Sequence, residues 1–269
     1  MNGFLRVEAA RASDGRTVLA QQAFRAPFHL GKPYWDGQVL QVQVVNPTAG
    51  ILAGDRLELA VRVSGGAALM MTTPAAARAF MMRDGAAAEC RQTFTVAAGG
   101  WLEYAPEPLC PHGDSDYSQV TRIEVAETGE AFWVETLAPG RVGRGELWAW
   151  RRLRLGLEVG HGGELVLREQ LDSSGSEMAR AASFYGMPRG WLATILVLTP
   201  RPELGAGIGD RVRALHGAGR WLGVTRLRRG GCIVRAVAQD GQDLRDLLRE
   251  LRCIMAEAFP RLASDPRKL

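Results

Sequence analysis

Apolar and polar side chains alternate along the first two-thirds of the chain, which is typical of half-buried β-strands. In each segment the apolar residue falls on every second position, and charged or polar residues stand between. The segments are Leu40/Val42/Val44, Leu57/Leu59/Val61/Val63, Phe94/Val96, Ile123/Val125 and Leu153/Leu155/Leu157/Val159. They recur at irregular intervals, so a fixed-length repeat array is not expected. The pattern predicts a mainly β body of many short strands.

The hydrophobic pattern changes after about residue 173. Residues 191–198 and 231–237 read as buried strands, and residues 211–216 as part of a helix. The last apolar series has helical spacing and indicates a helix that Asp240 caps and Pro260 ends. Its positions are Leu244, Leu247, Leu248, Leu251, Ile254, Met255, Ala258 and Phe259. We therefore predict an all-β body over 1–175 and a small α+β portion over 176–269, packed on it or continuous with it. The apolar stripe is interpreted as core rather than as a partner surface.

One short segment inside the β body has helical features. Thr73 is suited to an N-cap, Pro74 to the first helical position, and three alanines follow. We expect a helix of about two turns over residues 73–80.

Composition excludes a disordered chain, a collagen-like protein and a disulfide-rich miniprotein. The 269 residues are 46% hydrophobic and 23% charged, as in an ordinary globular protein. The longest apolar run, 191–198, is far shorter than the roughly 20 residues of a membrane span. No secretory signal is visible at the start of the sequence, so a cytoplasmic location is expected.

Charge and cysteine usage exclude two further kinds of site. The net charge is +4, but the arginines alternate with acids instead of gathering on one stretch, so no nucleic-acid partner is expected. The four cysteines are far apart and form no C-x-x-C pair, which favours reduced thiols over a structural zinc site.

Two groups of residues carry candidate chemistry. The first is the stretch CPHGDSD at 110–116, where Cys110, His112, Asp114 and Asp116 would face one side of an extended loop. This mixed donor set suits a borderline transition metal, and the alternative is a polar turn.

The second group consists of carboxylates inside otherwise apolar strands. Buried carboxylates need partners, ions or water. As a set they would line a polar cavity or supply the paired acids of a glycoside hydrolase, and spacing alone does not choose between these. The residues are Glu103, Glu135, Glu146 and Glu169, together with Asp55 directly after a glycine.

Four blocks of sequence resemble, in order, motifs of the UreD/UreH family of urease accessory proteins. NPTAGILAGDRL at 46–57 is similar to "PPGGI-xx-GD-x-L", and TTPAAAR at 72–78 to "TTxxAxK". WLEYAPEP at 101–108 is similar to "LEYLPEP", and PGRVGRGE at 139–146 to "GRxxxGE". A weaker match closes the chain at 266–269. The matching motif residues are Gly50, Gly54, Thr72, Thr73, Glu103, Gly140, Arg141 and Glu146.

The resemblance implies a superhelical or β-sandwich-like body and a scaffold without catalytic activity. Members of that family bind the accessory protein UreF and through it the GTPase UreG, and they dock on apo-urease. They are thought to pass nickel through a polar tunnel, with no tightly bound cofactor. The resemblance thus implies a urease maturation factor; the alternative from the carboxylates is a hydrolase on a β scaffold.

The resemblance also assigns roles to particular residues. Asp55 matches the acid of the Gly-Asp motif, Glu135 an acidic strand position before Gly-Arg, and Glu169 an acid after an apolar run. We expect these three carboxylates to face one internal polar cavity and to contact nickel in transit. Cys110 and His112 stand where the family has apolar residues, as an extra metal contact or as a simple turn.

Overall fold

The computed structural model describes residues 1–201 and 207–264. The strands and helices of these ranges follow in chain order. They are β1 (Asn2–Arg11), β2 (Thr17–Arg25), β3 (His29–Leu30), β4 (Tyr34–Asp36), β5 (Val39–Val45), β6 (Arg56–Val63), β7 (Ala68–Thr72), β8 (Ala77–Ala79), η1 (Arg83–Gly85), β9 (Ala88–Val96), β10 (Trp101–Ala105), β11 (Leu109–Pro111), β12 (Asp116–Val125), β13 (Glu130–Leu137), η2 (Val142–Arg144), β14 (Arg152–His161), β15 (Glu164–Ser173), α1 (Gly175–Phe184), β16 (Trp191–Leu198), α2 (Ile208–Arg213), β17 (Arg220–Arg226), β18 (Cys232–Ala238), α3 (Gly241–Ala256) and η3 (Pro260–Ala263).

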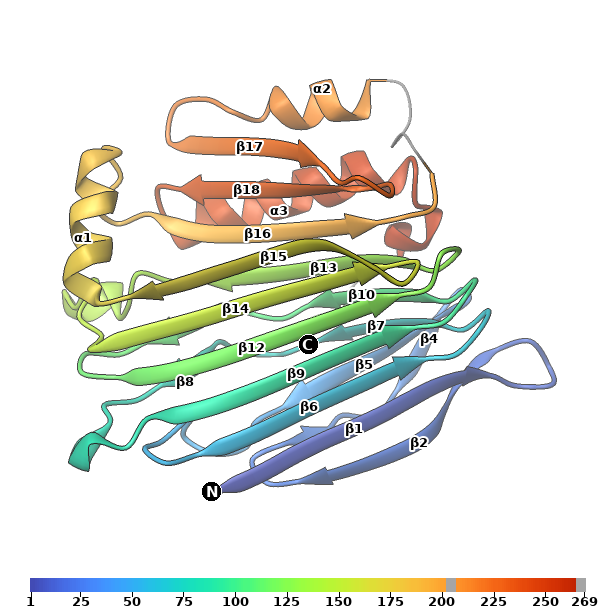
Figure 1. Cartoon of the computed structure of the whole chain (residues 1–269), viewed down its shortest axis with the longest axis horizontal. Coiled ribbons are helices and arrows are strands. Elements are labelled where there is room, and N and C mark those ends of the chain that lie inside the picture. Colours follow the sequence, from blue (N-terminus) through green and yellow to red (C-terminus); the bar gives the residue numbers. More distant parts are fainter. Residues whose placement is uncertain (202–206, 265–269) are drawn as a thin grey trace.

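Within the described ranges the strands form two stacked sheets. The seven-stranded sheet has the order β15-β14-β12-β9-β6-β1-β2 and lies in front in Figure 1. The eleven-stranded sheet has the main order β17-β18-β16-β13-β10-β7-β5-β3, with β4, β8 and β11 attached at its side. The predicted mainly β fold is confirmed.

The chain winds between the two sheets as a solenoid. From β5 to β14 successive long strands alternate between the layers, and neighbours within each layer are parallel. Parallel neighbours need a crossover connection, and here each crossover is a strand of the opposite sheet. As a result, the strand ends of each layer gather at common edges.

The alternating apolar positions face the space between the sheets. The predicted inward residues of β6 and β14 are buried or partly buried there, together with Phe94, Ile123 and Trp133. Burial of such side chains contributes about 1.5–3 kcal/mol each. The apolar core is therefore the inter-sheet layer that the period of two predicts.

A second core covers the outer face of the eleven-stranded sheet. Helix α3 begins after Asp240, whose carboxylate accepts hydrogen bonds from Gln242 N and Asp243 N, as predicted. Its fully buried face packs against β16 and β18, behind which it lies in Figure 1. The buried residues of α3 are Leu244, Leu247, Leu251 and Met255. The stripe is core, as interpreted from the sequence.

The C-terminal portion extends a sheet of the β body. Strand β16 pairs antiparallel with β13, and β18 and β17 follow at the edge. The boundary between residues 175 and 176 stays a prediction. The family match at 266–269 lies outside the described residues.

The predicted helix over residues 73–80 is wrong. The segment leaves β7, bends, and enters the short strand β8, which pairs with β11. The local preference of Pro74 and the alanines for helix is overridden because Ala77 to Ala79 supply backbone hydrogen-bonding groups to a neighbouring strand.

Candidate functional site

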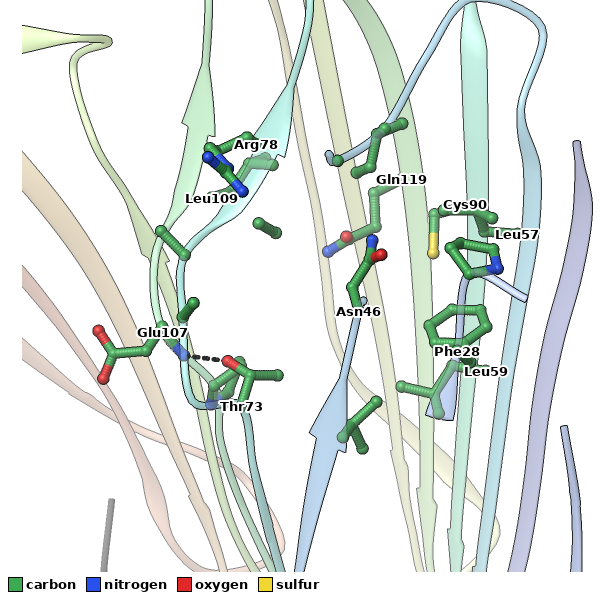
Figure 2. A pocket seen from close by; sticks show the side chains of 18 of the residues that line it. Phe28, Asn46, Leu57, Leu59, Thr73, Arg78, Cys90, Glu107, Leu109 and Gln119 are labelled. Carbon is green, nitrogen blue, oxygen red and sulfur yellow. Dashed lines mark hydrogen bonds between the residues drawn. The ribbon is translucent and has the colours of Figure 1, made fainter. Parts of the chain in front are cut away.

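Three of the sequence motifs meet at one opening between the sheets. Residues of the loops after β5, β7 and β10 line a single cavity of about 280 Å³. These three strands are parallel neighbours, so their carboxyl ends share an edge. In Figure 2, Thr73, Glu107 and Arg78 lie on one side of this cavity and Phe28 and Cys90 on the other. We call it the mouth cavity.

Hydrogen bonds join the motif loops around the mouth cavity. The Thr72 hydroxyl donates to Ala105 O at 2.7 Å, and Thr73 Oγ1 accepts from Glu107 N at 2.8 Å, a bond drawn in Figure 2. Both threonines thus link the β7 loop to the β10 loop. Their role in this structure is to hold the opening in shape.

Gly50 is required by close packing at the same opening. Its φ is +148°, and a Cβ there would lie 2.5 Å from Arg78 O and 2.8 Å from the Phe80 ring. Ile51 N, next in the chain, donates to the same Arg78 carbonyl at 2.7 Å. A side chain at position 50 would therefore separate the two loops.

Asp55 closes the turn that follows. Its Oδ2 accepts from Leu52 N at 2.9 Å, its Oδ1 accepts from the Met1 amino group at 2.6 Å, and Gly54 has φ +73°. The carboxylate is buried and is used by this turn. It is not among the described residues that line the mouth cavity or the second cavity below, so the expected grouping of three carboxylates is corrected to two.

A polar network lies deeper between the sheets. Glu135 of β13 accepts a hydrogen bond from Gln119 Nε2 of β12 at 2.6 Å. Gln119 Oε1 in turn accepts from Tyr117 Oη at 3.0 Å and from Gln92 Nε2 at 3.1 Å. All four residues line the mouth cavity. The network crosses the inter-sheet space from one layer to the other.

This environment changes the protonation of Glu135. Burial, and secondly the negative charge of Glu169, raise the pKa of Glu135 from 4.5 to about 7, although the Gln119 hydrogen bond acts in the opposite direction. Burial also raises the pKa of the neighbouring Cys90 thiol to about 11. Glu135 is thus a carboxyl group that exchanges its proton near neutral pH beside a neutral thiol.

A second cavity of about 750 Å³ adjoins the first at Glu135. Glu135 lines both cavities, and Glu169 of β15 lines the second. We call it the acidic cavity. The structure therefore brings together two of the three carboxylates expected from the sequence.

The Glu169 carboxylate has a cationic partner. The guanidinium of Arg235, from β18, forms an ion pair with it across the gap between the sheets. The Glu169 side chain is 34% exposed and that of Arg235 is 42% exposed. The acidic cavity thus holds one carboxyl group beside neutral partners and one in an ion pair.

The Gly140/Arg141/Glu146 motif forms a separate turn. Arg141 binds Glu146 through two hydrogen bonds, one of them 2.8 Å long between Nη2 and Oε1. The Arg141 hydrogen bond lowers the pKa of Glu146. Gly140 has φ +125°, and a Cβ there would be 2.6 Å from Glu146 O. This motif stabilises a loop.

Glu103 is also used by the fold. It is fully buried on the outer side of β10 and receives 2.8 Å and 3.1 Å hydrogen bonds from Arg252 of α3. This two-pronged ion pair fixes the helix to the sheet.

Cys110 and His112 do not assemble with the acids that follow them. Cys110 Sγ contacts Gly140 O at 3.4 Å, and the His112 ring packs edge-on against Phe80 at 4.6 Å. Asp114 is exposed, and Asp116 pairs with Arg154 at 2.8 Å. Burial lowers the pKa of His112, with Arg141 as the next cause. Over residues 1–201 and 207–264, no group of three His, Cys, Asp or Glu side chains is arranged to hold a metal ion.

Three residues of the site were not singled out from the sequence. Gln92, Gln119 and Arg235 stand in the same phase as the inward apolar residues of their strands. A polar side chain in that phase is the signal that identifies the two glutamines. Arg235 stands between Val234 and Ala236, where the phase is hidden because β18 is buried on both faces.

Similarity to known proteins extends over almost the whole chain. A family model described as UreD urease accessory protein matches residues 1–268. A urease accessory protein UreD of Opitutus terrae is 49% identical over 269 residues, covering 99% of this chain and 98% of the relative. One of Sorangium cellulosum is 31% identical, covering 90% and 77%, and one of Acetivibrio thermocellus is 33% identical, covering 60% and 62%. In the part of the chain that the structure describes, no helix is long and apolar enough to cross a membrane.

Proposed function

Because this chain belongs to the UreD family of urease accessory proteins, with a role in urease maturation, we propose that it passes nickel towards apo-urease through its two adjoining cavities. In this proposal it is a scaffold rather than a catalyst, and nickel is its cargo. It acts in the cytoplasm with the accessory proteins UreF and UreG.

The observation that carries this proposal is the position of Glu135. It lines both the mouth cavity and the acidic cavity, and Glu169 faces the second of these. A route for an ion needs polar groups in succession through an otherwise apolar interior. Glu135 supplies that group at the junction, and Gln119 and Gln92 continue it towards the mouth.

The chemistry of the lining suits a metal in transit. Nickel binds nitrogen and sulfur ligands tightly, so clustered thiolates or imidazoles would retain it. Spaced carboxylates with water exchange more readily. Glu135 and Glu169 come from opposite sheets and offer oxygen ligands, while burial keeps the nearby Cys90 thiol protonated.

Proton exchange at Glu135 also supports a role for this residue in nickel transfer. A carboxyl group must lose its proton to bind a metal ion. With a pKa of about 7, Glu135 releases a proton when a dication arrives and recovers it when the dication leaves. The protonated form also avoids an uncompensated buried charge between transits.

The hydrolase alternative receives less support from the same residues. A glycoside hydrolase needs a free acid and a free carboxylate on either side of its substrate. Glu103, Glu146 and Glu169 are each held by an arginine. The carboxylates that drew attention in the sequence are mostly committed to ion pairs.

The experiment that tests this function is urease maturation with single variants of the cavity carboxylates. Glu135→Gln keeps an acceptor for Gln119 but removes the charge, and Glu169→Gln does the same at the second position. We expect each variant to lower urease activation several-fold while UreF and UreG are still captured in a pull-down. Asp172→Asn is the matched control, because Asp172 is on the same strand as Glu169 but pairs with Arg152 at the surface.

Two results would refute the proposal. Activation at the native level by both Glu135→Gln and Glu169→Gln would remove the role of the cavities. An equal loss with Asp172→Asn would show that the assay reports general damage to β15 instead.

A further inference from the structure

Among the described residues that line the acidic cavity, Arg235 is the only one with a guanidinium group. Along the eleven-stranded sheet it stands in line with two other inward residues: Arg235 is paired with Thr194 of β16, and Thr194 with Glu135 of β13. Its guanidinium reaches across the gap to Glu169 on the opposite sheet. It therefore lies between the layers, beside Glu169, and lines the same cavity as Glu135.

The charges that face this cavity come from few groups. Among its described lining residues the titratable or charged side chains are Glu135, Glu169, Arg235 and His216. His216 Nδ1 accepts a hydrogen bond from Leu222 N at 3.2 Å and so keeps a lone pair engaged with the backbone. Arg235 is thus the fixed positive charge that balances the acids, since a guanidinium is not deprotonated in proteins.

The position of Arg235 affects how a dication would bind. Two carboxylates in one cavity, without a cation, form a site that attracts a divalent ion strongly. Arg235 Nη2 pairs with Oε2 of Glu169, an oxygen atom that the ion would need. Any dication must displace the guanidinium from Glu169 and accept its repulsion while it stays.

Space for that displacement exists on the neighbouring strand. Gly223 of β17 is the direct cross-strand partner of Arg235, and a Cβ built there meets no atom within 4 Å. The glycine leaves room beside the guanidinium on the side away from Thr194. The ion pair is also partly exposed, with 42% of the Arg235 side chain accessible. The structure therefore allows the arginine to leave Glu169 without moving the sheet.

We propose that Arg235 is an internal competing cation that prevents Glu135 and Glu169 from becoming a tight metal site and so promotes release of the ion. This inference rests on the proposed function, because it takes these carboxylates as contacts of a divalent cation. A competing cation and a purely structural salt bridge have opposite effects on the affinity for nickel. Loss of a structural bridge weakens binding in a loosened cavity, whereas loss of a competitor strengthens it.

The test is nickel(II) chloride titrated into the full-length chain by calorimetry. Arg235→Gln removes the charge, and Arg235→Met removes it while keeping a long apolar stem, which offers a second chance of a well-folded protein. We expect nickel to bind at least about tenfold more tightly to these variants than to the native chain. Arg235→Lys, which keeps a positive charge, should remain close to native. The Arg152→Gln variant is the control, since Arg152 pairs with Asp172 on β15 outside the cavity.

The location of the added affinity is tested by a second substitution. Glu169→Gln placed in the Arg235→Gln chain should abolish the gain, because the released carboxylate is its source. Unchanged or weaker nickel binding by Arg235→Gln and Arg235→Met, with native melting temperatures, would overturn the proposal. An increase in nickel affinity that persists after Glu169→Gln is added to Arg235→Gln would also overturn the proposal.

The nickel titration can fail or succeed independently of the urease maturation experiment that tests the proposed function. The titration measures binding by this chain alone, whereas the maturation experiment measures activation of urease. If Arg235 variants bind nickel natively while Glu135→Gln impairs maturation, only the role of Arg235 fails. If Arg235 variants bind more tightly but Glu135→Gln and Glu169→Gln both mature urease normally, the competing cation stands and nickel transfer through the cavities fails.

Discussion

At the scale of single residues, the site depends on polar groups placed in an apolar layer. Glu135 and Glu169 were identifiable from the sequence because each carboxylate interrupts an apolar strand. Asp55, an acid directly after a glycine, was expected to join them, yet its carboxylate closes a turn with Leu52. Sequence shows that a buried acid needs a partner, but the partner is chosen by the fold. Arg235 also interrupts an apolar strand, but it was not identified because the criterion was applied to carboxylates alone.

The raised pKa of Glu135 predicts a pH dependence of stability. In the unfolded chain this group titrates near 4.5, and in the folded protein near 7. Between these values the folded state binds more protons, so stability falls as pH rises through the window and is level above it. For this group alone the loss is about 3 kcal/mol.

Denaturant unfolding of the native chain and of Glu135→Gln checks this sign. The difference in unfolding free energy between them should shift in favour of Glu135→Gln as pH increases from about 4.5 to about 7. A difference that does not vary with pH would show that Glu135 has an ordinary pKa.

Cys110 and His112 are expected to be dispensable. Cys110 lies in β11 and the buried His112 follows it, and the acids beside them are exposed or paired with arginine. The Cys110→Ala/His112→Ala chain should therefore activate urease within about twofold of the native level, since neither side chain belongs to a group of metal ligands in the described part of the chain. Loss of most activation in a chain that still melts normally would identify the turn as a nickel contact.

At the scale of elements, hydrophobic periodicity was a reliable guide where packing follows the local pattern. The alternating segments became strands, and the last apolar stripe became α3 with the expected cap. The segment at residues 73–80 failed because its backbone pairs with β11, which is distant in sequence. Propensity favoured a helix by fractions of a kcal/mol per residue, and strand pairing outweighed it.

Helix α3 should be necessary for folding. Leu251 is completely buried against the eleven-stranded sheet, so Leu251→Ala is expected to lower the unfolding free energy by about 2–5 kcal/mol. The loss is measured by chemical denaturation. Cys253→Ala, an exposed position on the same helix, should change stability by less than about 0.5 kcal/mol. Native stability of Leu251→Ala would mean that the stripe is not core.

At the scale of the whole molecule, the solenoid brings distant motifs to one place. The loops at 46–51, 73–78 and 106–109 share an opening because successive turns stack their parallel strands. Glu135 and Glu169 lie in opposite sheets and line one cavity because β15, the edge strand of its sheet, lies opposite the part of the other sheet that β13, β16 and β18 form. The order of strands within each sheet decides these contacts. A mainly β class was predictable from periodicity, but this order was not, since periodicity contains no information on which strands pair.

The measurement that tests passage of nickel through the two cavities most directly is the nickel content of urease matured with the Glu135→Gln/Glu169→Gln chain. Nickel per active site is determined by elemental analysis of the purified urease, alongside urease matured with the native chain and with Asp172→Asn. We predict a nickel content several-fold below native for the double variant, with UreF and UreG still bound to it, and a native content for Asp172→Asn. A native nickel content in urease matured with the double variant would contradict passage of nickel through these cavities.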